Sequence, residues 1–372
     1  MTGQIVLLSI ALGLVTNELG EVSPWLARRL VRWSARLRYR HDPERLAIRA
    51  EELEDVVGNA PGKLLKLLCA AGFAASAVAH RAHRSVAGLV SRLGRDARRQ
   101  KFRRRAGLVV LASSGVTLLA ISTARVGVVA ELVGLGGALL AVVSVVVVFH
   151  RVGRWKRGQV GLRWLGFGWG ACIATTTALV INNTAEAVGD LLLGKGNGDK
   201  VSSIVSAPLF EEAAKGVFVL GILLFVKSKI NGVIDGVIYA GFVGAGFAFT
   251  ENIYYFGRAF AEHGLGDTNT AGLVTSFILR GMLSPFTHPL FTCIVGVGIG
   301  LAAMTTKRRA TVFGPIYGYL GAVILHAIWN GAATLGNGEF FLNVYFMVMV
   351  PIFIAGVWLV ARHRKRERTA ST

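Results

Sequence analysis

The sequence is poor in cysteine, and its apolar stretches lack the period-2 alternation of a membrane β-barrel. The three cysteines, Cys69, Cys172 and Cys293, lie in apolar segments without the spacing of a metal site, so we expect packing roles and no disulfide framework. Hydrophobic residues make up 53% of the chain, and several apolar runs reach about 18 residues, the length of a transmembrane helix. Because only helices and closed barrels can span lipid, the sequence predicts an all-α, polytopic transmembrane helical bundle.

Acidic residues are scarce, with 21 Asp and Glu against 41 Lys and Arg and a net charge of +20. A charge of this size could indicate a nucleic-acid-binding protein. The basic residues, however, cluster in the N-terminal third, in short loops and at the C-terminal tail, as the positive-inside rule expects of a membrane protein. We therefore interpret the charge as membrane topology and expect the lipid bilayer, and no nucleic acid, as a partner.

Composition divides the chain into three parts. Residues 1–105 form a basic N-terminal extension, cytoplasmic or interfacial, residues 106–361 form the membrane core, and residues 362–372 form a basic cytoplasmic tail. Within the extension, residues 5–15 predict a short apolar anchor. The Arg-rich residues 25–57 and then residues 63–79 predict amphipathic helices, the first of them lying on an anionic leaflet.

The core contains eight predicted transmembrane spans. They lie at residues 106–124, 128–149, 161–182, 207–226, 233–256, 284–304, 312–335 and 343–361. The connections before the first span and after the second, fourth, sixth and eighth are basic, whereas the alternate connections are neutral, mixed or acidic. The positive-inside rule then places both ends of the core in the cytoplasm.

Polar side chains occur in four of these spans at one predicted depth, the outer half of the membrane. They are Glu211 and Glu212 in the fourth span, Glu251 and Asn252 in the fifth, His288 in the sixth, and His326 and Asn330 in the seventh. Taken singly, each could be a snorkelling carboxylate or a packing residue. A charged residue in hydrocarbon costs about 2.5–3.5 kcal/mol on insertion scales, so their coincidence predicts a water-accessible site.

Helix geometry suggests roles for the charged residues of the fourth span. Lys215 follows Glu211 by four residues and Glu212 by three, so it shares a face with both and can neutralise one of them. The other carboxylate can act as a general base that activates water. Successive helical residues are about 100° apart, so one glutamate should face the reaction centre while the other orients a neighbour. We place Glu212 slightly ahead as the residue that meets the water.

The other spans offer hydrogen-bond donors and space for water. His326 and Asn330 are four residues apart, hence on one helix face, and could donate to a developing oxyanion. Tyr255 follows Glu251 by four residues in the same way. His288 lies between two prolines in "SPFTHP", where a kink would open room for water.

Other intramembrane chemistries lack their motifs. The sequence has no HExxH zinc motif. "GNGD" at 196–199 formally matches the GxGD of aspartyl proteases, but it lies in a polar loop with no second aspartate placed within a span. "ASSG" at 112–115 lacks the GxSG pattern of a rhomboid nucleophile. Peptide-bond hydrolysis by glutamate and histidine is the chemistry that these residues suggest.

Four motifs, in order on four consecutive predicted spans, resemble those of the PrsW family of intramembrane proteases. They are "FEEAAKG" for EExxK, "FAFTENIYY" for ENxxY, "SPFTHP" for PxxH and "HAIWNG" for HxxxN/D. The resemblance covers roughly residues 106–360. That family belongs to a wider group with the CAAX prenyl endopeptidases and the bacterial CPBP (Abi) proteins.

The resemblance implies site residues and a choice of mechanism. The implied catalytic residues are Glu211, Glu212, His288, His326 and Asn330, and the supporting residues are Lys215, Glu251, Asn252, Tyr255 and Arg280. Some relatives have Asp at the position of Asn330, and since Asn is not an anionic metal ligand, an oxyanion donor fits better there. A zinc ion could be held by His288, His326 and Glu211 or Glu212. Alternatively, glutamate and histidine activate water without metal, which the missing HExxH-like spacing favours.

The resemblance further implies an endopeptidase of the bacterial plasma membrane that cuts a single-pass, anti-sigma-factor-like membrane protein near its outer face. Two other classes of function stay open. A non-catalytic scaffold or immunity protein of the CPBP type need not keep all four motifs. A proton-coupled transporter could also use a buried carboxylate–lysine pair, but the sequence shows no inverted repeat.

Overall fold

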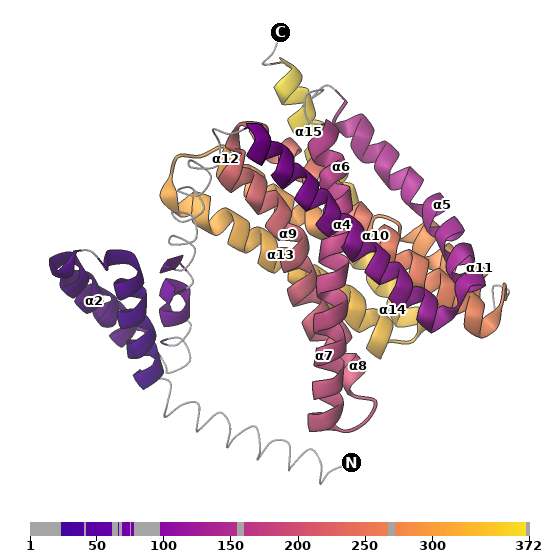
Figure 1. The fold of residues 1–372 in the computed structure, drawn as a ribbon, viewed down its shortest axis with the longest axis horizontal. Coiled ribbons are helices and arrows are strands. Elements are labelled where there is room, and N and C mark those ends of the chain that lie inside the picture. Colours follow the sequence, from indigo (N-terminus) through magenta and orange to yellow (C-terminus); the bar gives the residue numbers. More distant parts are fainter. Residues whose placement is uncertain are drawn as a thin grey trace. The chain divides into compact units, whose positions relative to one another are not determined.

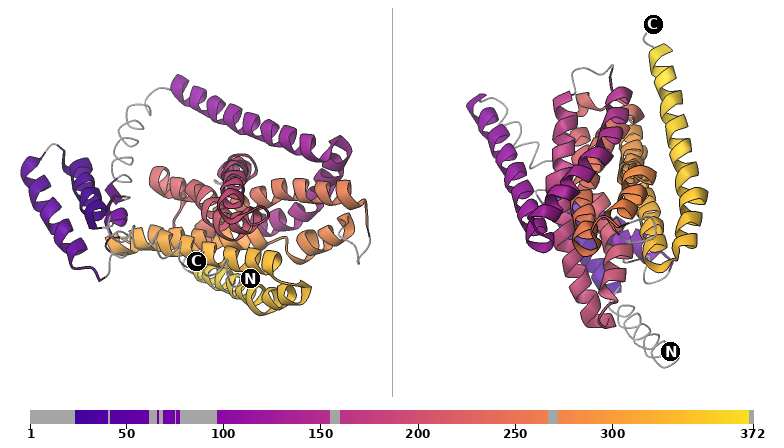
Figure 2. Two further views of the ribbon diagram at one scale, coloured as in Figure 1. Left: turned by 90° about the horizontal axis from the view of Figure 1, so that it is seen from below. Right: turned by 90° about the vertical axis from the view of Figure 1, so that its right-hand side faces the viewer.

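The computed structural model describes residues 24–40, 42–61, 66, 69–74, 76–77, 97–154, 160–266 and 272–369. Within these residues every regular element is a helix (Figures 1 and 2), which confirms the all-α prediction. The chain divides into two compact units, Met1–Phe102 and Arg103–Thr372. The predicted anchor at 5–15 lies outside the described residues. So does part of the helix predicted at 63–79, whose described residues 66, 69–74 and 76–77 are helical.

Residues 24–58 of the first unit form two helices where one was expected. Residues 24–39 form the first, and α2 (Pro43–Gly58) begins after Asp42, whose side chain accepts a hydrogen bond from the backbone of Arg45. The single helix predicted over 25–57 is therefore wrong, because Asp42 caps a new helix and Pro43 starts it. The two helices bury Ala27, Val31 and Val57 in a common cluster with Ala70.

The second unit is built from long helices joined by short connections. The first are α4 (Ala97–Val126) and α5 (Val128–Val152). Next, α6 (Val160–Gly168) continues through the π-helical turn η2 (Trp169–Ala174) into α7 (Thr175–Leu193). A second continuous run comprises α8 (Gly198–Val201), the π turn η3 (Ser202–Ser206) and α9 (Ala207–Phe225), followed by the short 3₁₀ turn η4 (Lys227–Lys229).

The remaining helices complete the bundle. They are α10 (Val233–His263), α11 (Leu273–Ser276) with the π turn η5 (Phe277–Leu283), α12 (Thr287–Ala303), α13 (Arg308–Leu335), and α14 (Gly338–Val344), which runs through the π turn η6 (Tyr345–Met349) into α15 (Val350–Thr369). A break at residues 284–286 separates η5 from α12. It coincides with Pro285, which has no N–H for a helix, so the expected kink is a full interruption.

Seven helical runs of the described residues are long and apolar enough to cross a membrane. They are Arg105–Val126, Val128–Val152, Val160–Leu193, Val233–His263, Leu273–Ala303, Arg309–Leu335 and Gly338–His363. Each overlaps a predicted span, although the run that ends at Ala303 begins at residue 273 rather than 284. The remaining predicted span, the fourth, is α9, a 19-residue helix whose three ionisable residues set it apart by composition.

The central helix is α10, which packs against α5, α6, η2 and α12. Its contacts are close enough to require glycine. A Cβ atom added to Gly170 of η2 would lie 1.9 Å from the carbonyl oxygen of Val243, and one on Gly236 would lie 2.0 Å from that of Gly296. Close backbone approach at small residues is the usual way in which membrane helices associate, and it holds α10 among its neighbours.

We expect Gly170→Ala to destabilise the detergent-solubilised protein, because the new methyl group meets backbone that cannot move aside. Overpacking of this kind costs about 1–3 kcal/mol or more. The matched control is Gly161→Ala on α6, where no atom lies within 4 Å of the added Cβ. Thermal unfolding followed by size-exclusion chromatography measures both; an unchanged midpoint for Gly170→Ala would contradict the packing described.

Candidate active site

A buried lysine lies between the two glutamates of α9. The Nζ atom of Lys215 is 2.8 Å from Oε1 of Glu212 and 3.3 Å from Oε2 of Glu211. The side chains of Lys215 and Glu212 are 0% exposed, and that of Glu211 is 5% exposed. The ring of Phe247 lies 3.7 Å from the ammonium group. Lys215 therefore shares a face with both glutamates, as their spacing predicts, and supplies their counter-charge.

Glu212 is fully engaged by its neighbours. Besides Lys215, its Oε1 lies 3.1 Å from Nδ1 of His326 on α13, and its Oε2 accepts a hydrogen bond of 3.2 Å from Thr292 on α12. His326 donates from Nδ1 to this carboxylate, which leaves its Nε2 with a free lone pair. Glu212 thus orients His326, whose ring also stacks on Phe291 at a centroid distance of 4.7 Å.

Glu211 instead faces a polar cavity. Its Oε2 lies 4.0 Å from Nε2 of His326, and its Oε1 accepts a hydrogen bond of 3.1 Å from the amide of Asn182 on α7. The Asn182 amide oxygen in turn accepts a hydrogen bond from Ser206 at 3.0 Å, and its backbone carbonyl accepts one from Ser202 at 3.0 Å. Asn182 thereby ties the Glu211 carboxylate to α7 and η3.

His288 is held at both ring nitrogens. Its Nδ1 lies 3.2 Å from Nζ of Lys215, and its Nε2 lies 2.6 Å from Oε2 of Glu251 on α10. Because an ammonium group can only donate, Nδ1 is the acceptor and Nε2 carries the hydrogen that Glu251 accepts. Lys215 and Glu251 therefore fix the orientation of this imidazole between α9 and α10.

Arg280 of η5 organises the neighbouring groups. Its guanidinium donates to Glu251 at 3.1 Å and to the side-chain oxygen of Asn252 at 3.0 Å. It also lies over the ring of Tyr255, 3.9 Å from the centroid. A guanidinium can use several donors at once, and here it joins all three residues of the ENxxY segment to the helix before His288.

Asn330 holds the other side of the cavity. Its amide donates a hydrogen bond of 2.8 Å to the backbone carbonyl of Ser203 in η3. Because an amide group has two N–H bonds, one of them engages η3 and one is left for another acceptor. Among the described residues, Ser203 is its hydrogen-bond acceptor.

The cavity between these residues has a volume of about 310 Å³. Seven of the ten predicted site residues line it, namely Glu211, Glu251, Tyr255, Arg280, His288, His326 and Asn330, and so does Asn182. Of the ten predicted site residues, the other three, Glu212, Lys215 and Asn252, lie behind this lining and contact it. Residues from five helices (α7, α9, α10, α12 and α13) and η5 thus come together in one place.

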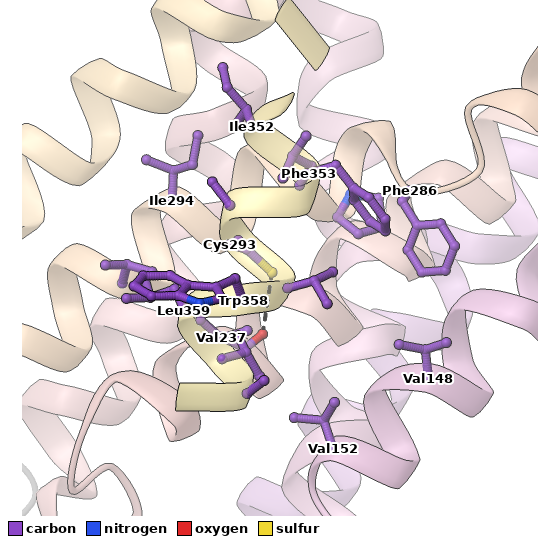
Figure 3. A pocket seen from close by; sticks show the side chains of 18 of the residues that line it. Val148, Val152, Val237, Phe286, Cys293, Ile294, Ile352, Phe353, Trp358 and Leu359 are labelled. Atoms are coloured by element: carbon purple, nitrogen blue, oxygen red, sulfur yellow. Dashed lines mark hydrogen bonds between the residues drawn. The ribbon is translucent and has the colours of Figure 1, made fainter. Parts of the chain in front are cut away.

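A larger cavity of about 1020 Å³ lies elsewhere in the bundle. Figure 3 shows its side chains, which come from α5, α10, the break before α12, α12 itself and α15, and include Val148, Val237, Phe286, Phe353 and Trp358. The Cys293 thiol points into it and contacts the carbonyl oxygen of Val237 at 3.5 Å. Among the described residues, no charged side chain lines this cavity. The ionisable side chains suited to hydrolysis lie in the smaller, polar cavity.

The donor set can hold a metal ion. Single ligand atoms of Glu211, His288 and His326 all lie within 4.8 Å of one another, and two histidines with one carboxylate form a common catalytic zinc set. Glu212 supports His326 as carboxylates do around metal-bound histidines. These residues fit a zinc ion on one condition. Both ring nitrogens of His288 are hydrogen-bonded, so His288 must give up its contact with Lys215 or with Glu251 before it can bind the ion.

The sequence interpretation missed Asn182 and Thr292, the two uncharged side chains that bind the glutamates. Asn182 carried a signal, because two asparagines interrupt the apolar stretch "ALVINNTAE". It is the last residue of the third predicted span, 161–182, and its role follows only from its contact with Glu211. Thr292 carried none, because a threonine can satisfy its hydroxyl within its own helix.

Comparison with known proteins identifies the family. The profile of the PrsW family intramembrane metalloproteases matches residues 159–356, just over half of the chain. The chain belongs to this family. The matched region contains all four motifs and every residue of the site, which confirms the resemblance to PrsW; the wider grouping with the CAAX prenyl endopeptidases stays a prediction.

Two curated relatives carry the name Protease PrsW. The protein from Oceanobacillus iheyensis is 25% identical over 177 residues, 46% of this chain and 69% of that protein. The protein from Geobacillus kaustophilus is 31% identical over 107 residues, 29% of this chain and 41% of that protein. No solved structure gives a significant match. Together with the seven membrane-capable helices, membership of the PrsW family makes the chain a multi-pass membrane protein.

Removal of the Lys215 ammonium should unfold the site. We expect Lys215→Met to destabilise the protein by about 3–5 kcal/mol, because it leaves buried carboxylates without their counter-charge. Adding Glu212→Gln to this variant should restore part of the loss, since one buried charge is then gone. Thermal unfolding in detergent measures both.

The matched control is the exposed pair of Arg258 and Glu262, which are also four residues apart, at 2.8 Å. Arg258→Met should leave the unfolding midpoint unchanged, because exposed ion pairs contribute little. Equal effects of Lys215→Met and Arg258→Met would contradict the role given to Lys215.

Proposed function

We propose that the chain hydrolyses a peptide bond of a single-pass membrane protein in the polar cavity, near the outer face of the bacterial plasma membrane. The observation that carries the proposal is the convergence of Glu211, His288 and His326, with ligand atoms within 4.8 Å of one another, beside a cavity in a member of an intramembrane protease family.

Glu211 is the general base in this proposal, in place of the Glu212 preferred from the sequence. The reason is access. Glu211 lines the cavity, whereas the Glu212 carboxylate is 0% exposed and is already bound by Lys215, His326 and Thr292. A base must come within hydrogen-bond reach of the water that it deprotonates, and Glu211 is the glutamate of α9 placed to do so.

The two histidines and Asn330 complete the reaction site. His326 presents the lone pair of Nε2 towards Glu211, so it can take up the proton that Glu211 removes from water and then deliver that proton to the leaving amine. Glu212 stabilises the imidazolium formed in between. The second N–H of Asn330 is available for the oxyanion that develops on the scissile carbonyl. Glu251 acts as a positioning residue because it accepts a hydrogen bond from His288. Arg280 acts in the same way because it holds Glu251.

A zinc ion, when bound by Glu211, His288 and His326, would supply a Lewis acid for the scissile carbonyl. In that scheme Glu211 and His326 would serve as ligands, whereas the residues behind them would keep their tasks. Glu212 holds His326, Asn182 holds Glu211, and Lys215 offsets the charge of the Glu212 carboxylate. The substrate that the family resemblance favours is an anti-sigma-factor-like protein, cut where its membrane helix reaches the outer half of the bilayer.

The role of Glu211 can be tested in proteoliposomes that contain a candidate single-pass substrate. We expect Glu211→Gln to lower kcat by about 10²–10⁴-fold, the usual contribution of a general base. Glu186→Gln should leave kcat unchanged, because Glu186 lies in the same cavity but is exposed. Full activity of Glu211→Gln would refute the proposed base.

The same proteoliposomes can be used to test whether the protein binds zinc and needs it for cleavage. If the ion is bound, metal analysis should find about one zinc per chain. Glu212→Gln should then lower zinc affinity by about 10–100-fold, as loss of a carboxylate behind a metal-bound histidine does. Cleavage that withstands chelation in a metal-free preparation would assign the chemistry to glutamate and histidine alone.

Asn182 should matter for turnover more than for substrate binding, because its amide orients the Glu211 carboxylate. We expect Asn182→Leu to lower kcat at least tenfold with little change in KM. Its neighbour Asn183 also lines the cavity but is exposed, so Asn183→Leu is the matched control. A rise in KM at constant kcat would instead place Asn182 in substrate binding.

A further inference from the structure

The first helix of the N-terminal unit, residues 24–39, has two unlike faces. One face buries Ala27, Val31 and Ala35, partly in the cluster shared with α2. The apolar side of this amphipathic helix is therefore already used inside the unit. The face of the helix opposite to these buried residues is exposed on the surface of the unit.

That outward surface is made of arginine and tryptophan, and we call it the Arg/Trp face. It consists of Trp25, Arg29, Arg32, Trp33, Arg36 and Arg40. These positions are spaced by three, four or one residue, so they lie along one side of the helix and the turn after it. Trp25 is 53% exposed and Trp33 is 46% exposed, which is unusual for so large an apolar side chain in a unit with its own core.

Charge is segregated between the two helices of the unit. Residues 24–40 contain six arginines and no acidic residue, whereas α2 contains five acidic residues and two arginines. On the Arg/Trp face, Arg32 pairs with Glu54 of α2 at 2.5 Å. For Arg29, Arg36 and Arg40 no carboxylate partner occurs among the described residues.

The arginines and tryptophans of this face are also in contact. The guanidinium of Arg29 lies 5.0 Å from the centroid of the Trp25 ring. Trp33 lines a shallow groove of about 320 Å³ together with Arg36, Leu37, Arg40 and Leu46. A flat apolar ring flanked by guanidinium groups suits a surface that carries phosphates above hydrocarbon.

We propose that the Arg/Trp face binds the anionic phospholipid surface of the membrane that the core spans. Guanidinium groups pair with phosphate through two hydrogen bonds, and tryptophan prefers the headgroup level of a bilayer. The anionic leaflet attracts basic segments near the membrane. The face matches that surface in both its charge and its aromatic content.

The chain itself keeps this unit near the bilayer. Only residues 78–104 separate Ala77 from Arg105, where the first membrane-capable run begins. Such a tether gives a high effective concentration of headgroups, so modest affinity suffices for binding. The basic residues "RRQKFRRR" precede that run, which places the unit on the cytoplasmic side, where anionic lipids concentrate. Tethering at a lipid surface favours phospholipid over nucleic acid, to which arginine and tryptophan could also bind.

The experiment uses the full chain in nanodiscs of phosphatidylcholine alone or with phosphatidylglycerol, its three native cysteines replaced by alanine. A fluorophore is attached at Leu26→Cys, beside the Arg/Trp face, or at Ile48→Cys on the exposed side of α2. Lipids with a spin label at the headgroup act as quencher. We expect quenching of the Leu26 site in anionic discs only, its loss in high salt, and little quenching of the Ile48 site.

The triple variant Arg29→Gln, Arg36→Gln, Arg40→Gln should lower the membrane partition of the unit by on the order of a hundredfold. The matched control, Arg45→Gln with Arg49→Gln on α2, should leave it unchanged. Equal quenching of the Leu26 site in neutral and anionic discs would overturn the proposal. So would a response of that site to added RNA with none to phosphatidylglycerol. The readout does not depend on proteolysis, so it stands apart from the function proposed for the core.

Discussion

Two adjacent carboxylates can be buried in this bundle because the ammonium group of Lys215 lies between them. An unpaired ion in such surroundings costs several kcal/mol, and Lys215 is within 3.3 Å of both glutamates. The same Nζ atom reaches His288 on α12 and lies over Phe247 of α10. One positive charge therefore fixes the rotation of α9 and links it to two neighbouring helices, and the rest of the site is arranged around that position.

The packing of the helices gives different roles to Glu211 and Glu212, which look equivalent in the sequence. Glu211 and Glu212 are neighbours in the chain, yet one faces the cavity and the other faces His326 and Thr292. Helix periodicity predicts that the two side chains point in different directions, but it does not predict which of them faces the cavity. That choice depends on residues 80 and more positions away, and it is set by packing that no local pattern encodes. The local pattern marks Asn182 as a polar interruption of an apolar stretch, but its contact with Glu211 depends on the same packing between helices.

What the sequence predicted well was local. Apolar runs of sufficient length located all seven membrane-capable helices, and the motif residues of α9, α10, α12 and α13 do meet in one cavity. The N-terminal extension shows a local signal that was overlooked. Asp42 followed by Pro43 is a helix start, and it divides residues 25–57 into two helices whose apolar sides pack together. The apolar side chains on which the prediction of an amphipathic helix rests therefore pack inside the unit.

The π turns around the site carry a consequence for how such proteins are compared. A π turn holds one more residue than an α turn, so η3 equals a single insertion inside a continuous helix. Its backbone and hydroxyls reach Asn330 and Asn182, and η5 carries Arg280. In an alignment with a relative that has regular α-helices at these positions, each π turn would appear as a one-residue insertion. Such insertions usually mark loops between helices. In this bundle they would mark the helical turns that line the cavity.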